Sequence, residues 1–154
     1  DKSEEETLDI IAQRSRDDSR TPMQWNSSEN AGFTTGTPWI GLADNYRQIN
    51  AAAEMDDPDS VRNFYKTLVH LRKTHKVISE GKIKFLYPDD ADLLAYRRYG
   101  AEDGEELLVL CNLTEHEVSY DLPEGWADAD KLLGNYPDRN DALRPYECLI
   151  LTKA

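Results

Sequence analysis

The spacing of apolar residues changes at Gly81, and this change constrains the fold more than any other feature of the chain. Before Gly81, apolar residues recur at intervals of three and four positions, which is typical of one face of a helix. After it, short apolar runs alternate with turn residues, which is typical of an antiparallel sandwich. We therefore expect a mainly β fold, an antiparallel Greek-key-type β-sandwich preceded by an irregular loop segment and one helix. The helical positions are Val61, Phe64, Tyr65, Leu68 and Leu71.

Several runs after Gly81 are candidate strands, and Gly, Pro and Asp residues supply the turns between them. The central run, Leu107–Leu110, is apolar on both faces, so we expect a strand buried between two layers. Trp126 and Tyr146 are isolated aromatic residues, which favours a core or interface role over a sugar-binding surface. The candidate strands are Lys82–Tyr87, Leu93–Tyr99, Leu107–Leu113, Glu117–Asp121, Lys131–Asn135 and Cys148–Thr152.

Helical signals occur ahead of these strands. The stronger helix is expected from Asp57 to about Lys76, with Asp57 as its cap and Pro58 in its first turn. A shorter helix is expected from Glu4 to about Gln13, with acidic residues near its start, where the helix dipole favours them.

Residues 15–50 contain glycines and prolines that interrupt regular structure, yet they also contain large aromatic side chains. A solvated linker has no use for large rings, so we expect a packed functional loop. Trp25, Phe33 and Trp39 are expected mainly to pack within this loop, with stacking on a sugar as the alternative. The first third of the chain lacks the apolar surface for a core of its own, so it should be the edge of a domain that precedes residue 1.

The net charge of −12 is spread along the chain. Nucleic acid is therefore not an expected partner, because phosphate binding needs clustered Lys and Arg. No apolar run approaches the roughly 20 residues that a membrane span requires, so no membrane partner is expected. His70, His75 and His116 are scattered, and no metal site or cofactor is expected.

Asp1 opens the chain in place of a methionine, and no charged-then-apolar leader follows it. We expect a fragment of a longer protein and, since no export signal is visible, a cytoplasmic location.

Cys111 and Cys148 lie in apolar, strand-like runs. Two buried free thiols in a reducing compartment are expected in preference to a disulfide.

A set of motifs across nearly the whole chain resembles the oligo-1,6-glucosidase group of the α-amylase superfamily. The segment Ser15–Trp25 reads SRDDSRTPMQW, and it is similar to the region after the eighth barrel strand in that group. The motifs are highly specific as a set, although each alone is weak. The other matching segments are Asn30–Thr34, Thr37–Ile40, Asn45-Tyr46, Ile49-Asn50, Leu71–Lys73 and Leu143–Glu147.

This resemblance implies a (β/α)8 barrel that bears the active site at the carboxy ends of its strands and is followed by a β-sandwich. Residues 1–79 then correspond to the end of the barrel, with its last helix, and residues 80–154 to the C-terminal β-sandwich domain. The missing N-terminal barrel becomes an expected partner. The family's catalytic carboxylates belong to earlier barrel strands, so no residue of this chain is assigned a catalytic role.

Arg16 and Arg20 are the substrate-binding residues that the resemblance implies. Arg16 matches the family arginine that reaches the subsite for the non-reducing-end glucose, and Arg20 matches a second arginine near the pocket mouth. A guanidinium suits this role because its planar fork binds sugar hydroxyls while it pairs with a carboxylate. The alternative is that either arginine only pins the loop through backbone carbonyls or ion pairs.

The implied activity is that of a retaining, exo-acting α-glucosidase, whose small-sugar substrates are short α-glucosides such as isomalto-oligosaccharides. The segment Gly41–Tyr46 resembles trehalose-6-phosphate hydrolases, which are the alternative within the same class. A free-standing carbohydrate-binding β-sandwich and a purely structural domain are the alternatives from other classes. The chain alone is expected to be inactive, because the two-carboxylate displacement lacks both carboxylates.

Overall fold

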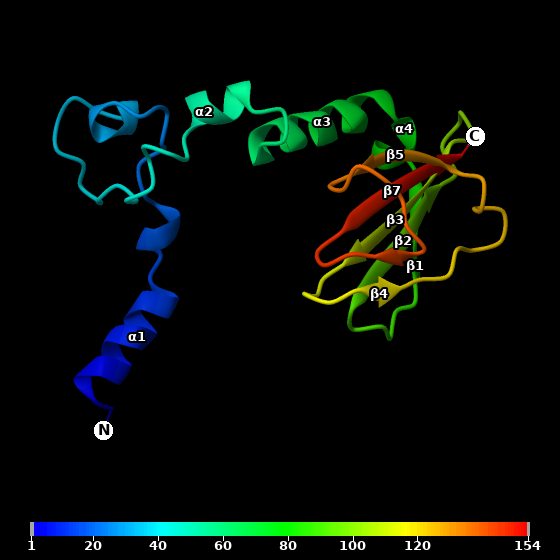
Figure 1. The fold of residues 1–154 in the computed structure, drawn as a ribbon, viewed down its shortest axis with the longest axis horizontal. Helices are drawn as coiled ribbons and strands as arrows, with labels where there is room; N and C mark the ends of the chain where they lie inside the picture. Colours follow the sequence, from blue (N-terminus) through cyan, green and yellow to red (C-terminus); the bar gives the residue numbers. More distant parts are fainter. Residues whose placement is uncertain (1, 154) are drawn as a thin grey trace. The chain divides into compact units, whose positions relative to one another are not determined.

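The computed structural model describes residues 2–153 and divides into two compact units (Figure 1). One unit ends at Thr67 and the other begins at Leu68. The first is helical and irregular, and the second consists mostly of antiparallel strands. The expected mainly β fold is confirmed, whereas the expected domain boundary after residue 79 stays a prediction. Within residues 2–153, no helix is long and apolar enough to cross a membrane.

The first unit opens with helix α1 (Glu4–Arg14), close to the expected bounds. Ser3 and Glu6 form a capping box, in which Ser3 Oγ accepts from the Glu6 amide at 3.1 Å and Glu6 Oε2 accepts from the Ser3 amide at 2.8 Å. Two 3-10 turns follow, η1 (Asp17–Ser19) and η2 (Glu29–Gly32). Helix α2 (Ala51–Asp56) was not expected from the sequence, because six residues are too few to show a helical period.

Helix α3 (Val61–Thr74) begins four residues later than expected, so the role assigned to Asp57 as its cap is wrong. Ser60 fills that position, since its Oγ accepts from the Asn63 amide at 3.2 Å. Asp57 instead closes the preceding turn, with its Oδ1 accepting from the Asp59 amide at 2.9 Å. A short helix, α4 (Lys76–Ser79), leads into the strands.

Five strands form one antiparallel sheet in the order β1-β2-β3-β7-β5, and two short strands, β4 and β6, pair separately. All the candidate strands are present within a few residues of their expected bounds. Only β6, two residues long, was missed, because so short a segment shows no alternation. The strands are β1 (Lys82–Leu86), β2 (Leu93–Tyr99), β3 (Glu106–Asn112), β4 (Val118–Ser119), β5 (Asp130–Gly134), β6 (Ala142–Leu143) and β7 (Cys148–Lys153).

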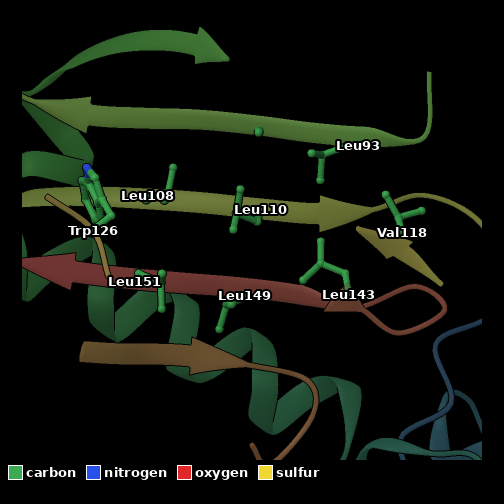
Figure 2. Packing of buried hydrophobic residues seen from close by; sticks show 9 residues of the cluster. Leu93, Leu108, Leu110, Val118, Trp126, Leu143, Leu149 and Leu151 are labelled. Atoms are coloured by element: carbon green, nitrogen blue, oxygen red, sulfur yellow. The ribbon is translucent and has the colours of Figure 1, made fainter. Parts of the chain in front are cut away.

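The core of the second unit lies on one face of this sheet (Figure 2). Trp126 is completely buried there, which confirms its expected core role. The central strand β3 is buried on both faces, as its continuous apolar run predicts. Tyr146 departs from the expectation of a core or interface role, because it is 61% exposed and has a left-handed φ of 54°. The buried cluster comprises Leu93, Ala95, Leu108, Leu110, Val118, Trp126, Leu143, Leu149 and Leu151.

Candidate functional site

Arg16 and Arg20 stand at the two ends of the 3-10 turn η1 in the first unit. The turn is closed by main-chain atoms, with the Ser19 amide donating to the Arg16 carbonyl at 3.3 Å and the Arg20 amide donating to the Asp17 carbonyl at 2.9 Å. Ser19 Oγ also donates to the Arg16 carbonyl, at 2.8 Å. The backbone of Arg16 therefore fixes the turn and leaves its side chain for other contacts.

Both guanidinium groups are exposed. Neither makes a hydrogen bond or ion pair with any partner among the atoms that the structure describes. In the alternative role, either arginine pins the loop through its guanidinium. No contact with a described residue supports that role. Each planar group carries five donors that a ligand can use.

Beyond Arg20 the chain is held as a closed loop by its own backbone. The Trp25 amide donates to the Ala31 carbonyl at 2.9 Å, and the Ala52 amide at the start of α2 donates to the Trp25 carbonyl at 3.0 Å. Asn50 is buried and caps α2, with its Oδ1 accepting from the Ala53 amide at 3.0 Å. The loop that carries the two arginines is thus joined to a helix terminus by specific hydrogen bonds.

Three successive residues of this loop, Asn30, Ala31 and Gly32, have left-handed backbone, with φ of 51°, 55° and 67°. A left-handed non-glycine residue costs about 1 kcal/mol or more and persists only where its surroundings hold it. Ala31 is completely buried, and Asn30 Nδ2 donates to the Gly36 carbonyl at 3.0 Å. Backbone strain of this kind concentrates at functional sites, and the sequence signal for it was the Asn-Ala-Gly run.

A hollow of about 440 Å³ lies beside this loop, but it does not include either arginine. Two of its polar side chains contact the nearby backbone: Gln24 Nε2 donates to the Ile49 carbonyl, and Glu54 Oε2 accepts from the Arg62 amide at 3.0 Å. The hollow thus contains neither of the residues that the sequence predicts to bind a substrate. Its lining is Thr21, Pro22, Met23, Gln24, Trp25, Ile49, Asn50, Ala51, Glu54 and Arg62.

The packing expected for the loop aromatic residues is contradicted at Trp39, whereas Trp25 and Phe33 are half-buried. Trp39 is 92% exposed, and Trp25 and Phe33 are about half exposed, at 51% and 50%. Contiguous exposed apolar patches mark interaction surfaces, whereas single exposed apolar side chains are ordinary, so the exposure of one ring does not by itself identify a binding surface. The sequence located these rings in a single loop, but it did not predict how exposed Trp39 is.

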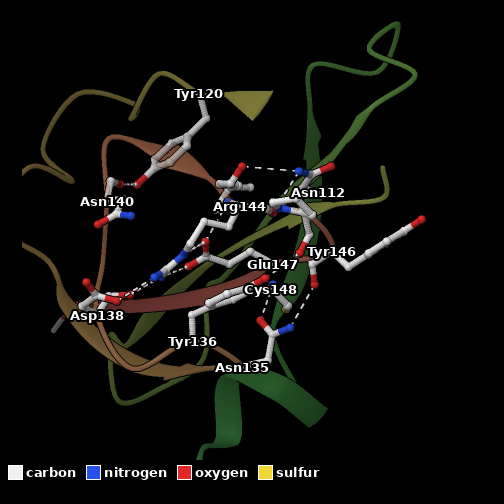
Figure 3. Close-up of polar contacts among 12 residues, drawn as sticks. Asn112, Tyr120, Asn135, Tyr136, Asp138, Asn140, Arg144, Tyr146, Glu147 and Cys148 are labelled. Atoms are coloured by element: carbon white, nitrogen blue, oxygen red, sulfur yellow. Dashed lines mark hydrogen bonds and ion pairs between the residues drawn. The ribbon is translucent and has the colours of Figure 1, made fainter. Parts of the chain in front are cut away.

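A separate polar cluster surrounds Arg144 in the second unit (Figure 3). The Arg144 guanidinium binds Glu147 through Nε at 2.9 Å and Nη2 at 3.0 Å, binds Asp138 through Nη1 at 2.7 Å, and lies 4.0 Å from the centre of the Tyr136 ring. The Glu147 side chain is only 3% exposed. The donors of Arg144 are matched by the acceptors of Glu147 and Asp138, so this cluster is structural. The sequence indicated it only as part of the Leu143–Glu147 motif.

The hydrogen bonds from Arg144 hold the pKa of Glu147 below its ordinary value, against the opposing effect of burial. A carboxylate with a lowered pKa in the folded state stabilises the fold above its unfolded pKa, about 4.3, and loses that contribution as the pH falls. Glu147→Gln should therefore lower Tm at pH 7 and flatten the decline of Tm below about pH 4.5. Thermal melts of the chain between neutral and acid pH measure this, with exposed Glu124→Gln as the control. An unchanged pH profile for Glu147→Gln would remove Glu147 from the account of acid stability.

Comparison with known proteins adds to this geometry. Residues 1–81 match the family model for the alpha amylase catalytic domain. The chain is 42% identical over 151 residues to an oligo-1,6-glucosidase of Heyndrickxia coagulans, covering 96% of this chain and 26% of the relative. It is 44% identical over 154 residues to a trehalose-6-phosphate hydrolase of Bacillus subtilis (strain 168), covering 94% of this chain and 27% of the relative. The chain thus spans about a quarter of the length of the curated relatives it matches.

Solved structures agree with these matches. The trehalose-6-phosphate hydrolase of Bacillus licheniformis matches with a TM-score of 0.89 and 41% identity, covering 98% of this chain and 28% of that one. The trehalulose synthase of Pseudomonas mesoacidophila MX-45 matches with a TM-score of 0.88 and 39% identity, again covering 98% and 28%. These proteins carry different activities on the same fold, so the fold alone does not choose a substrate.

Proposed function

Because the chain belongs to the α-amylase family, we propose that it is the C-terminal part of a retaining, exo-acting α-glucosidase that hydrolyses short α-glucosides such as isomalto-oligosaccharides. The observation that carries the proposal is the loop of residues 15–50, in which both motif arginines are exposed and make no side-chain contact with a described residue. The turn that bears them is closed by backbone hydrogen bonds, and strained backbone follows in the same loop at Asn30–Gly32. The complete enzyme, of which this chain is one part, is called the parent below.

Arg16 is proposed to bind the terminal glucose. The oxocarbenium-like transition state of a retaining glycosidase forms between two carboxylates, and hydrogen bonds to the sugar hydroxyls strengthen as it forms. A guanidinium at this place donates two parallel hydrogen bonds, one to a hydroxyl and one to a carboxylate of the parent. Arg20, at the other end of the turn η1, is proposed to contact the substrate near the pocket mouth.

The partner proposed for the first unit is the N-terminal barrel of the parent. The helices of the first unit expose large apolar side chains to water. These are Leu8 and Ile11 on α1 and Val61 and Tyr65 on α3. Trp39 adds an exposed ring on the loop. A barrel layer of the parent that covers these side chains would remove them from water and hold the arginine loop at its active site.

A trehalose-6-phosphate hydrolase is the second candidate. The two relatives reported above, one of each activity, are 42% and 44% identical to the chain, so identity does not separate them. The segment Gly41–Tyr46 is the feature that favours the second candidate. A free-standing carbohydrate-binding module has less support, because Trp126 is buried and only Tyr146, at 61% exposure, remains of the two rings that suggested it.

The chain by itself is expected to have no glycosidase activity, because it is proposed to lack both carboxylates of the displacement. Purified 154-residue chain and purified parent should be assayed side by side with p-nitrophenyl α-glucoside at equal molar concentration. The parent should release p-nitrophenol, and the chain should stay at the buffer background. Turnover by the chain alone would overturn the assignment of the catalytic carboxylates to the parent's barrel.

A cytoplasmic location is also proposed. It is supported by the two free thiols of Cys111 and Cys148, because free thiols are typical of reducing compartments.

A further inference from the structure

Cys111 and Cys148 face each other across two neighbouring strands. Cys111 is on β3 and Cys148 on β7, and they are direct partners in the antiparallel register. Their Sγ atoms are 3.2 Å apart, and both thiols are free. Both side chains are half-buried rather than fully buried, so a small reagent can approach them.

The position of this pair in the ladder suits a covalent bond. The Asn112 amide donates to the Glu147 carbonyl at 2.8 Å, which makes the adjacent cysteines a non-hydrogen-bonded pair. The Cα atoms of such a pair lie about 4.5 Å apart, and disulfides span Cα separations of about 4.4–6.8 Å. The sulfurs need to approach by about 1.2 Å to reach a bond length near 2.05 Å, and rotation of the side chains supplies this.

The backbone around the pair is already fixed. The Cys148 amide donates to Asn135 Oδ1 at 2.8 Å, and the next partners along the two strands, Leu110 and Leu149, belong to the buried core. Strand alternation then places the two sulfurs on the opposite face from that core. Forming a bond between them would not displace any core side chain.

The two thiols differ in pKa and therefore in reactivity. The hydrogen bond between the two thiols lowers the pKa of Cys111, because the Cys111 thiolate, once formed, accepts from the Cys148 thiol. The same contact raises the pKa of Cys148, and burial adds to that rise. Cys111 is therefore the nucleophile and Cys148 the thiol that completes the reaction.

We propose that Cys111 and Cys148 form a reversible disulfide that joins β3 to β7 when the chain meets a small-molecule disulfide oxidant such as oxidised glutathione. The Cys111 thiolate attacks one sulfur of the oxidant, forming a mixed disulfide and releasing one small thiol. Cys148 then attacks the Cys111 sulfur and releases the second. Two electrons pass to the oxidant, and the two protons of the cysteines end on the two released thiols.

The cross-link would act as a redox-dependent clamp on the C-terminal strand. The two cysteines are 37 residues apart in the sequence, so the bond restricts the unfolded chain more than the folded one. A rise in Tm of about 5 °C or more is expected on oxidation. Both thiols are free in the structure, so the reduced pair is the starting state of the proposed reaction.

The test is to equilibrate the 154-residue chain with mixtures of reduced and oxidised glutathione, block free thiols with N-ethylmaleimide, and measure intact mass. The fraction of chain with the Cys111–Cys148 disulfide at each glutathione ratio gives the effective concentration of one thiol at the other. This value is measured in native buffer and again in concentrated urea. The native value should exceed the urea value by at least about tenfold, because the fold holds the thiols together. Cys111→Ser and Cys148→Ser serve as controls, since each should form only the mixed disulfide.

Several results would overturn the proposal. They are a native effective concentration at or below the urea value, a glutathione adduct on Cys111 that Cys148 does not resolve, and a lower Tm for the oxidised chain than for the reduced chain. Because thiol blocking and mass measurement need no catalytic activity, these results do not depend on the glucosidase proposal.

Discussion

Replacing Arg16 with alanine in the parent should lower kcat/KM for an α-glucoside by about tenfold or more while Tm stays unchanged. A charge-assisted hydrogen bond to a buried hydroxyl is worth about 1.5–3 kcal/mol, and about 1.4 kcal/mol is a factor of ten. Stability should be unaffected, because the turn η1 is closed by the backbone of Arg16 and not by its exposed guanidinium. Arg16→Lys should recover little, since an ammonium group lacks the planar fork.

Arg14→Ala is the matched control, because Arg14 is also exposed and lies in the last turn of α1, outside the proposed site. Its kcat/KM should stay near that of the unmodified parent. A normal kcat/KM for Arg16→Ala would remove Arg16 from the substrate site. A reduced Tm with preserved kcat/KM would instead show that the side chain pins the loop.

Replacing Trp126 with alanine should unfold or severely destabilise the second unit. Trp126 is completely buried, and it lies under two cations, with Lys153 Nζ 4.7 Å and the Arg97 guanidinium carbon 5.7 Å from its ring. Truncation of a buried aromatic residue to alanine costs about 3–5 kcal/mol, through lost burial and the cavity left behind. Since whole domains are stable by about 5–15 kcal/mol, this is a large share of the total.

Urea unfolding of the 154-residue chain, followed by circular dichroism of the strands, measures this effect. Trp39→Ala makes the same change at a side chain that is 92% exposed, and the denaturation midpoint should then move little. Equal midpoints for the two variants would show that Trp126 does not hold the core together.

Much of the fold was predictable because the signals were local. Alternation and turn residues located strands such as β2 (Leu93–Tyr99), and the continuous apolar run identified β3 as the buried centre. The start of α3 was misplaced because Asp57-Pro58 and Ser60 both resemble helix starts, and only the hydrogen bond from Asn63 to Ser60 decides between them. The two-residue strand β6 depends on a partner distant in sequence, which no local pattern reveals.

The candidate site was predictable only in part. The resemblance picked out Arg16 and Arg20, but the surroundings of a side chain depend on which surfaces are covered, and that information lies outside a local motif. For this reason the exposure of Trp39 was not anticipated. The contact between Cys111 and Cys148 likewise follows from strand register, which the two separate apolar runs did not specify.

The most direct test of the central claim is the steady-state kcat/KM of the parent on isomaltose, maltose, sucrose and trehalose 6-phosphate, with released glucose measured enzymatically. We expect glucose from the non-reducing end, with isomaltose the best of the four substrates. The second candidate predicts that trehalose 6-phosphate is preferred instead. Release of no glucose from any of the four substrates by folded parent would contradict the assignment of this chain to an α-glucosidase.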